Sequence, residues 1–155
     1  MMNTDSFIIR RAAPQDAGTL VANRRGMFWD MGHHDTAALD SMLTKFKPWV
    51  VAKMEAEEYL SWLAIAEDGT VASGADLWLL DWPPHMLAQR RGYILNVYTD
   101  PRYRRRGLAR RLMDVAVEWC RANDIDMVVL HASQFGRPLY ESMGFSATTE
   151  MKMIL

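Results

Sequence analysis

The sequence predicts an α/β (α+β) fold in which a mixed β-sheet carries helices on both faces. Segments with strand and helix patterns follow one another along all 155 residues, with no repeat, low-complexity tract or linker between them. From Gly92 to His131 a strand, a basic glycine turn, a long helix and a second strand succeed one another, and such a βαβ unit makes its two strands parallel. Half of the residues are hydrophobic, which is enough for a substantial core. We therefore expect a single domain over residues 1–155.

The first sixty residues are expected to be mainly helical. A short strand over Phe7 to Arg11 comes first. The helical segments that follow are Pro14 to Arg25, Ala37 to Phe46 and Val50 to Tyr59. Pro14 suits a first helical turn, whereas Pro48 interrupts a helix and should separate the last two segments. A turn is expected over Met27 to Asp35, between the first two helices.

The middle of the chain is predicted to be a run of strands. Ser61 to Ala66 and Val71 to Leu80 form the two arms of a hairpin, because Asp68-Gly69 between them is a strong hairpin signal. Asp81 to Arg91 contains two adjacent prolines and is expected to be a loop. Gly92 to Thr99 is the next strand.

The clearest helix of the sequence is Arg105 to Asn123. Its apolar residues repeat at helical spacing and form one stripe: Leu108, Leu112, Val115, Ala116, Trp119 and Cys120. A buried strand is expected over Asp126 to His131, and then a short helix over Arg137 to Met143, ended by Gly144. Ser146 to Leu155 should supply the last strand or strands.

Charge and cysteine content exclude several classes of protein. The net charge is only −1, which gives no general reason for a nucleic-acid or membrane partner. Apolar runs such as Leu77 to Leu80 are far too short to span a bilayer, and Met1 to Arg11 lacks the apolar region of a signal peptide. Cys120 is the single cysteine and cannot form an internal disulfide, so a cytoplasmic protein is expected.

The positive charge is concentrated in one segment. Residues 102–111 contain six arginines and no acid, so the rest of the chain carries −7. Within this segment, Arg104 to Ala109 begins the long helix, where unpaired N–H groups and the helix dipole favour an anion. Gly107 lets the backbone approach a ligand closely, and Ala109 keeps the next contact small. These features predict a diphosphate site; a solvated basic helix start and a phosphodiester-binding arm are the alternatives.

Three segments, in order, resemble the GCN5-related N-acetyltransferase superfamily. Leu95 to Pro101 is similar to the strand that leads into the family's cofactor loop, and Arg104 to Ala109 (Arg-Arg-Arg-Gly-Leu-Ala) is similar to its acetyl-CoA signature. Leu139 to Phe145 (Leu-Tyr-Glu-Ser-Met-Gly-Phe) is similar to its C-terminal element. The resemblance covers Tyr93 to Phe145 closely and the N-terminal half only by the order of elements.

The resemblance implies a mostly antiparallel, splayed sheet and acetyl-CoA as cosubstrate, without a metal. The strands Gly92–Thr99 and Asp126–His131 would part to admit the pantetheine arm. Backbone groups of Val97, Tyr98 and Thr99 would pair with that arm, and the pyrophosphate would lie on the loop residues, which are Arg104, Arg105, Arg106, Gly107, Leu108 and Ala109. Ser133 stands where relatives often carry an asparagine that contacts the cofactor.

Tyr140 is the residue to which the resemblance gives the catalytic proton. A phenol stays protonated at neutral pH and can protonate the leaving thiolate; the alternative is that Tyr140 only packs beside Leu139 and Phe145. The strand Gly92 to Thr99 has no carboxylate that could act as the base. A water relay past backbone carbonyls or Asn96 is the first expectation.

The acceptor is expected to be a primary amine of a small molecule or peptide, held beside the first two helices. Candidate residues there are Trp29, His33, His34 and Asn96, and His33 or His34 is the second candidate for the base. Neither the histidines nor Cys120 shows the spacing of a metal site. A non-catalytic acyl-CoA sensor on the same fold is the alternative function, a nucleic-acid binder is a weaker one, and a monomer or homodimer is expected.

Overall fold

The computed structural model describes residues 6–86 and 90–155. Its described strands form one five-stranded sheet in chain order, antiparallel except that the last strand runs parallel to the fourth. The strands are β1 (Ile8–Arg11), β2 (Tyr59–Ile65), β3 (Val71–Asp81), β4 (Arg90–Thr99) and β5 (Met127–Leu130). The predicted mixed, mostly antiparallel sheet is confirmed.

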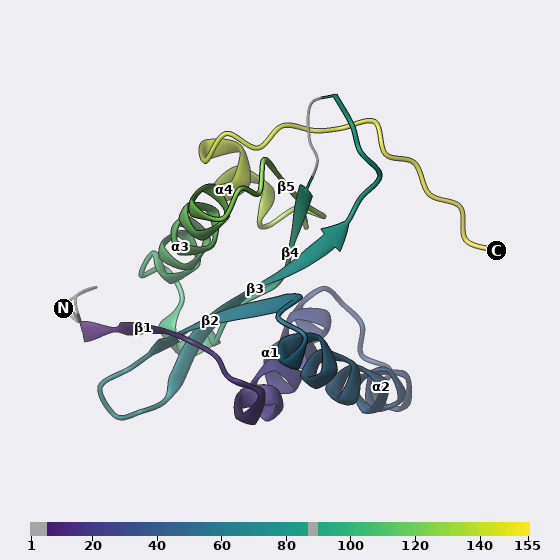
Figure 1. Cartoon of the computed structure of the whole chain (residues 1–155). Helices are drawn as coiled ribbons and strands as arrows, with labels where there is room; N and C mark the ends of the chain where they lie inside the picture. The colour runs from purple at the N-terminus through teal and green to yellow at the C-terminus, as the bar shows by residue number, and fades with distance from the viewer. Residues whose placement is uncertain (1–5, 87–89) are drawn as a thin grey trace.

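Four α-helices cover the sheet on both faces, also as predicted. They are α1 (Ala17–Asp30), α2 (Thr36–Glu55), α3 (Leu108–Ala122) and α4 (Arg137–Ser142). The first two lie against one face of the sheet, and α3 and α4 lie on the other (Figure 1). Two short 3₁₀ turns, Pro14–Asp16 and Pro101–Tyr103, lead into α1 and away from β4.

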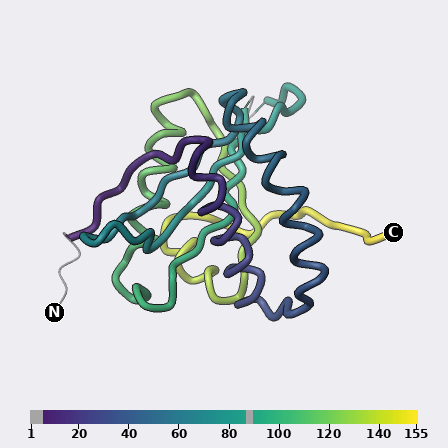
Figure 2. The backbone as a smooth tube through the Cα atoms, turned by 90° about the horizontal axis from the view of Figure 1, so that it is seen from below, coloured from purple at the N-terminus to yellow at the C-terminus, as the bar shows by residue number. Residues whose placement is uncertain are grey.

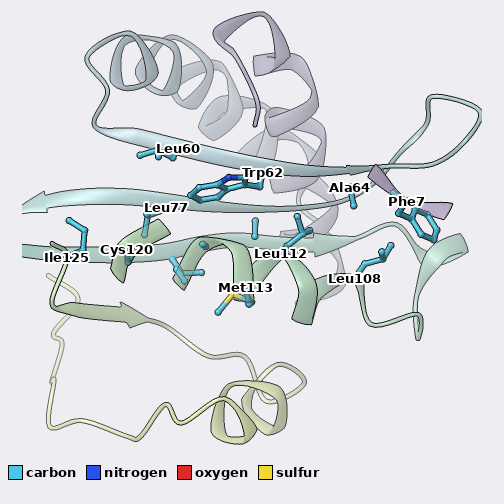
Figure 3. Close-up of a cluster of buried hydrophobic side chains, with 14 residues drawn as sticks. Phe7, Leu60, Trp62, Ala64, Leu77, Leu108, Leu112, Met113, Cys120 and Ile125 are labelled. Carbon is cyan, nitrogen blue, oxygen red and sulfur yellow. The ribbon is translucent and has the colours of Figure 1, made fainter. Parts of the chain in front are cut away.

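Each face of the sheet has its own hydrophobic core. The apolar stripe of α3 packs Leu108, Leu112 and Cys120 against the strands, together with Trp62 and Leu77 (Figure 3). Burial in this core raises the pKa of the Cys120 thiol to about 11, so the thiol is inert packing. The second core lies between the sheet and the first two helices, where the buried residues include Leu20, Leu43, Phe46, Val50 and Leu63.

The helical half differs from the sequence prediction in three places. The first helix continues to Asp30, through the first four residues of the stretch predicted as a turn. The two helices predicted on either side of Pro48 are one helix, α2. Its buried residues Leu39, Leu43, Phe46, Val50 and Met54 keep helical spacing across the proline, so packing on the sheet offsets the lost backbone hydrogen bond. Tyr59, predicted to end a helix, begins β2 instead.

Two differences concern the second half of the sheet. The fourth strand begins at Arg90, two residues before the predicted start; residues 87–89 of the expected loop lie outside the described residues. The strand expected over Ser146 to Leu155 is wrong for a single copy of the chain. After Phe145 the described chain joins no sheet and runs away from the body (Figure 1, Figure 2).

Candidate active site

The short fifth strand pairs along its whole length with the first half of the fourth strand and then ends. Their pairing covers Arg91 to Ile94 on β4 and Met127 to Leu130 on β5. From Leu95 to Thr99, no described strand pairs with this edge of β4. The splayed sheet implied by the sequence is therefore present, and it leaves backbone groups of Val97, Tyr98 and Thr99 beside the opening.

A β-bulge bends the fourth strand at this opening. Leu95 pairs with Asp76 and Tyr98 with Gly74, so the two residues between them on β4 oppose the single Ala75 of β3. One of these two, Asn96, has a left-handed backbone with a φ of 52°. Bulges increase the local bend and twist of a strand, which accounts for the departure of β4 from β5.

The basic loop follows directly and turns into α3. Arg105 and Gly107 both have left-handed backbones, with φ values of 61° and 73°. Backbones of this kind turn N–H groups into anion-binding concavities. No described side chain caps the start of α3, so its first N–H groups remain available to a ligand. Here lies a cleft of about 320 Å³, lined by Thr99, Tyr103, Arg104, Arg105, Gly107, Leu108, Ala109, Arg110 and Leu139.

At least three of the six arginines in this segment have carboxylate partners among the described residues. Arg102 pairs with Asp100 at 2.9 Å, and Arg110 pairs with Asp114 at 3.4 Å. Arg104 pairs with Asp30 at the end of α1 and donates to the Thr99 carbonyl at 2.9 Å. The concentrated charge read from the sequence is therefore partly neutralised, and the loop is tied to α1.

The fourth helix brings Leu139 to this cleft, and Tyr140 is the next residue. Leu139 lines the cleft, and Arg110 of α3 donates to Ser142 of α4 at 3.3 Å. The Tyr140 ring is half-buried against Phe145, and a Cβ on Gly136 would come within 2.8 Å of it. Burial raises the pKa of the Tyr140 phenol, which keeps the proton in place at neutral pH. No described residue forms a hydrogen bond with its hydroxyl.

Ser133 has a structural partner before this helix. Its Oγ accepts a hydrogen bond from the Gly136 N–H at 3.1 Å, and its carbonyl accepts from the Arg137 N–H at 3.0 Å. The serine therefore shapes the turn that precedes Tyr140.

Three of the four acceptor candidates lie together at the end of α1. The exposed His34 ring stacks on Trp29 at 4.4 Å, and its Nε2 lies 2.9 Å from the Trp29 carbonyl oxygen. His33 contacts Phe28 edge to face at 5.5 Å. The ion pair of the neighbouring Asp30 with Arg104 places this group next to the basic loop.

Asn96 lies apart from them, in a buried polar network beneath the bulge. Its amide nitrogen donates to Asp76 at 2.9 Å and to the Tyr59 hydroxyl at 3.0 Å, and its oxygen accepts from Arg24 at 2.6 Å. Tyr59 in turn donates to Asp76 at 2.7 Å. Burial raises the pKa of Asp76 to about 6. Our sequence reasoning missed this network, although one aspartate within the apolar strand Val71 to Leu80 is a signal that could have revealed it.

The raised pKa of Asp76 gives a prediction about stability. An acid with a folded-state pKa above its unfolded value of 3.8 makes the folded state bind the extra proton between these two values, so stability falls as pH rises from about 4 to about 6. Asp76→Asn removes this titration. Between these pH values the wild type should lose roughly 3 kcal/mol of unfolding free energy relative to the variant. Urea titrations of both proteins across this range measure the difference.

The exposed Asp114→Asn provides the control, because its carboxylate sits on the surface of α3. Because the Asp114 side chain is 55% exposed, its difference from the wild type should change less over this pH range than that of Asp76→Asn. A difference for Asp76→Asn that is equally flat would show that the buried carboxyl does not titrate there.

The other described parts of the chain show fewer features of a functional site. No group of three histidine, cysteine, aspartate or glutamate residues among residues 6–86 and 90–155 could hold a metal ion. None of the described helices is long and apolar enough to cross a membrane. A hollow of about 510 Å³ lies at the other end of α3 and has an open, mixed-charge lining: Arg90, Arg121, Asp124, Ile125 and Asp126.

Comparisons with known proteins agree with this geometry. Residues 25–145 match the model of the acetyltransferase (GNAT) family. A GCN5-related N-acetyltransferase from Ralstonia eutropha is 34% identical over 96% of this chain and 98% of its own, with a TM-score of 0.88. A predicted acetyltransferase from Clostridium acetobutylicum, solved with acetyl-CoA, is 29% identical over 96% of each chain, with a TM-score of 0.85.

More distant structures share the fold. An aminoglycoside N-acetyltransferase solved with coenzyme A is 18% identical, over 96% of this chain and 93% of its own, with a TM-score of 0.69. The search of curated proteins found no match. The family match spans most of the chain and includes the splayed strands, the basic loop and α4. The chain therefore belongs to the acetyltransferase (GNAT) family.

Proposed function

We propose that residues 1–155 form one cytoplasmic domain that transfers the acetyl group of acetyl-CoA to a primary amine of a small molecule or peptide. The observation that carries this proposal is the uncapped start of α3, behind the left-handed Gly107 and beside the open edge of β4. This arrangement offers an anion site and a strand edge next to each other, which are the two features that a pyrophosphate with an amide-containing arm needs. The acetyl-CoA complex of the Clostridium acetobutylicum relative supports the choice of cosubstrate.

The cosubstrate would lie across the opening between β4 and β5. The pyrophosphate would accept hydrogen bonds from N–H groups of residues 104–109, and Arg105 would add charge at the exposed side. The pantetheine arm would pair with backbone groups of Val97, Tyr98 and Thr99, as an added strand pairs with a free sheet edge. The Ser133 Oγ accepts a hydrogen bond from the Gly136 N–H. Ser133 would therefore contact the cofactor through atoms other than this hydroxyl.

In the proposed reaction the amine attacks the thioester carbonyl directly, in a ternary complex. The new carbon–nitrogen bond forms a tetrahedral intermediate, which then collapses with cleavage of the carbon–sulfur bond. Tyr140 donates its proton to the departing sulfur, and the amine nitrogen loses a proton to a base or to water. A phenol with a raised pKa is well suited to hold the proton until the thiolate forms.

An alkyl ammonium has a pKa near ~10, so a proton must leave before attack. A water relay past the backbone carbonyls at the bulge is our first choice. Asn96 would act in it by fixing the bulge, because its side chain is 2% exposed and its amide is occupied by Arg24, Tyr59 and Asp76. His33 or His34 is the second choice, because both are exposed beside the loop.

The pH dependence of kcat/KM separates these two routes. If a water relay removes the proton, the limb of the kcat/KM profile against pH should move with the pKa of the acceptor across a series of amines. This limb should still be present in both His33→Ala and His34→Ala. Direct histidine catalysis would instead give a limb of the kcat/KM profile that does not move with the pKa of the acceptor and that one of these substitutions removes. Loss of the limb in a folded histidine variant would overturn the relay.

The alternative function is an acyl-CoA sensor that binds without turnover. A sensor would bind acyl-CoA through the same loop and the same β4 edge. It would not need the proton of the Tyr140 hydroxyl. Acetyl-CoA incubated with a panel of amines distinguishes the two, since only the transferase releases free coenzyme A in an acceptor-dependent way.

A further inference from the structure

Arg24 of α1 is a half-buried cation at the bulge of β4. Its Nη1 donates to the Asn96 side-chain oxygen at 2.6 Å, and its Nε donates to Met42 Sδ at 3.4 Å. The guanidinium also contacts two aromatic rings, with Cζ 4.8 Å from the centre of Phe46 and 5.0 Å from that of Phe28. Burial lowers the pKa of Arg24, yet an arginine stays charged at neutral pH. The positive charge is therefore held by contacts that do not neutralise it.

This charge has no direct counter-ion among the described residues. The next residue, Arg25, pairs with Asp40, whereas no described carboxylate forms an ion pair with Arg24. Asp76 is linked to Arg24 only through Asn96, whose nitrogen donates to Asp76 and whose oxygen accepts from Arg24. Charges that are taken out of water are normally paired. A half-buried guanidinium in this state indicates a site for an anion.

The Nη2 atom is the part of the Arg24 side chain that a ligand can reach. Neither of its N–H groups donates to a described residue. The described side-chain atoms that are both fully enclosed and unpaired are Ser61 Oγ and Arg91 Nε, so Nη2 is open to solvent. The planar fork of a guanidinium matches the two oxygens of a carboxylate. One guanidinium also matches the single charge of a carboxylate better than the larger charge of a phosphate.

The packing of α1 on β4 places this cation beside the proposed cosubstrate site. Gly26 lies so close to Tyr98 that an added Cβ would come within 2.5 Å of the tyrosine ring. Asn96, which Arg24 contacts, occupies the bulge directly before Val97. Under the proposed function the pantetheine arm pairs with the residues from Val97 onward, so an amine beside the thioester would have Arg24 as a neighbour.

Aromatic side chains continue from Arg24 over the sheet face that carries α1 and α2 (Figure 1). The ring centres of Phe46 and Trp49 are 6.2 Å apart, those of Trp49 and Trp78 are 5.3 Å apart, and those of Trp78 and Tyr93 are 6.5 Å apart. Trp49 is 36% exposed, so this row of rings reaches the surface. Such rings favour an apolar group next to the anion.

We propose that Arg24 binds a carboxylate of the acceptor, and that the acceptor is therefore a free amino acid. The single carbon between the amine and the carboxylate of an amino acid suits a cation that contacts the bulge itself, at the start of the edge where the thioester would lie. Arg24 is then a residue that determines acceptor specificity, and Asn96 positions it. This inference rests on the proposed function and narrows its acceptor from primary amines in general to amino acids.

Acceptor preference in steady-state kinetics tests the role of Arg24. The probes are L-phenylalanine, L-leucine and L-methionine, chosen for the aromatic row, each beside its own amide, which lacks the carboxylate charge. In Arg24→Gln the ratio of kcat/KM for the acid to kcat/KM for the amide should fall by roughly 10–10²-fold, the loss of one charge-assisted hydrogen bond. The intrinsic reactivity of each amine cancels when this ratio is compared between two proteins.

Arg25→Gln is the matched control, because it removes a positive charge from the same helix that is exposed and already paired with Asp40. It should leave the acid-to-amide ratio unchanged. Arg24→Lys keeps the charge and should retain part of the preference, and it replaces Arg24→Gln as the test if the glutamine variant does not fold. Damage to the bulge alone would lower kcat/KM for the acid and the amide equally, so it would not change the ratio.

An acid-to-amide ratio that is the same in the wild type and the Arg24 variants, or that falls equally in Arg25→Gln, would overturn the assignment. Acetylation of the amides but of none of the acids would overturn it as well. Both results would leave acetyl transfer intact, whereas a failure to acetylate any amine would overturn the proposed function and this inference with it. Phosphoethanolamine is the test of a phosphate in place of the carboxylate. If its kcat/KM fell more in Arg24→Gln than that of the amino acids, the assignment to amino acids would be wrong.

Discussion

Gly107→Val is expected to remove most of the affinity for acetyl-CoA. The φ of 73° holds Gly107 in the left-handed region, and no atom lies within 4 Å of the position of an added Cβ. A valine side chain would therefore stand in the open cleft, where the pyrophosphate would approach the backbone. Loss of two charge-assisted hydrogen bonds, each worth about 1.5–3 kcal/mol, corresponds to roughly 10²–10⁴-fold weaker binding. Isothermal titration calorimetry with coenzyme A measures this loss.

The strain of a valine at positive φ also has to be separated from the loss of binding. Gly69→Val is the matched control, because Gly69 has a φ of 85°, equally open surroundings and a place in the β2–β3 hairpin. Both variants should lose about 1–2 kcal/mol of stability from the left-handed backbone, and only Gly107→Val should lose affinity. Equal coenzyme A affinity in the two folded variants would remove Gly107 from the phosphate site.

Tyr140→Phe is expected to lower kcat by ~10²–10⁴-fold, the usual contribution of general acid catalysis. The substitution keeps the ring that packs on Phe145 and removes only the hydroxyl. Because the proton is transferred after the cosubstrate has bound, the KM for acetyl-CoA should change little. Steady-state kinetics with a saturating amine measure both constants.

Tyr93→Phe is the control for removal of a half-buried hydroxyl, because Tyr93 lies on β4 and its hydroxyl contacts His131. This variant should keep a kcat near that of the wild type. If Tyr140→Phe retained full kcat while chemistry limits turnover, Tyr140 would be a packing residue only.

Local sequence patterns were sufficient to locate the basic glycine turn and α3. The arginines, Gly107 and the apolar stripe occur within twenty residues, and the structure keeps each in its predicted place. The length of α2 was determined by packing on the sheet, which the local sequence pattern does not show. Pro48 did not divide α2, because its buried face continues on both sides of the proline.

Features that depend on strand register could not be predicted from the sequence. Asp76 meets Asn96 only because β3 pairs with β4 and a bulge occurs at that point, and no local pattern encodes a pairing across twenty residues. The C-terminal segment is a related case, because a strand was expected over Ser146 to Leu155 but the described chain joins no sheet there. The pairing of Arg104 with Asp30 likewise joins residues far apart in the chain.

Acetyl transfer to an amine is the central claim, and acceptor-dependent release of coenzyme A tests it most directly. The protein would be incubated with acetyl-CoA and a panel of amino acids, polyamines, aminoglycosides and peptides, with free thiol measured over time and the amines analysed by mass spectrometry. The proposed function predicts that at least one amine is acetylated with equal release of thiol, and that Gly107→Val abolishes both. If the protein binds acetyl-CoA but the acetyl-CoA is recovered intact with every amine, this result would contradict the proposed function and identify the protein as a sensor.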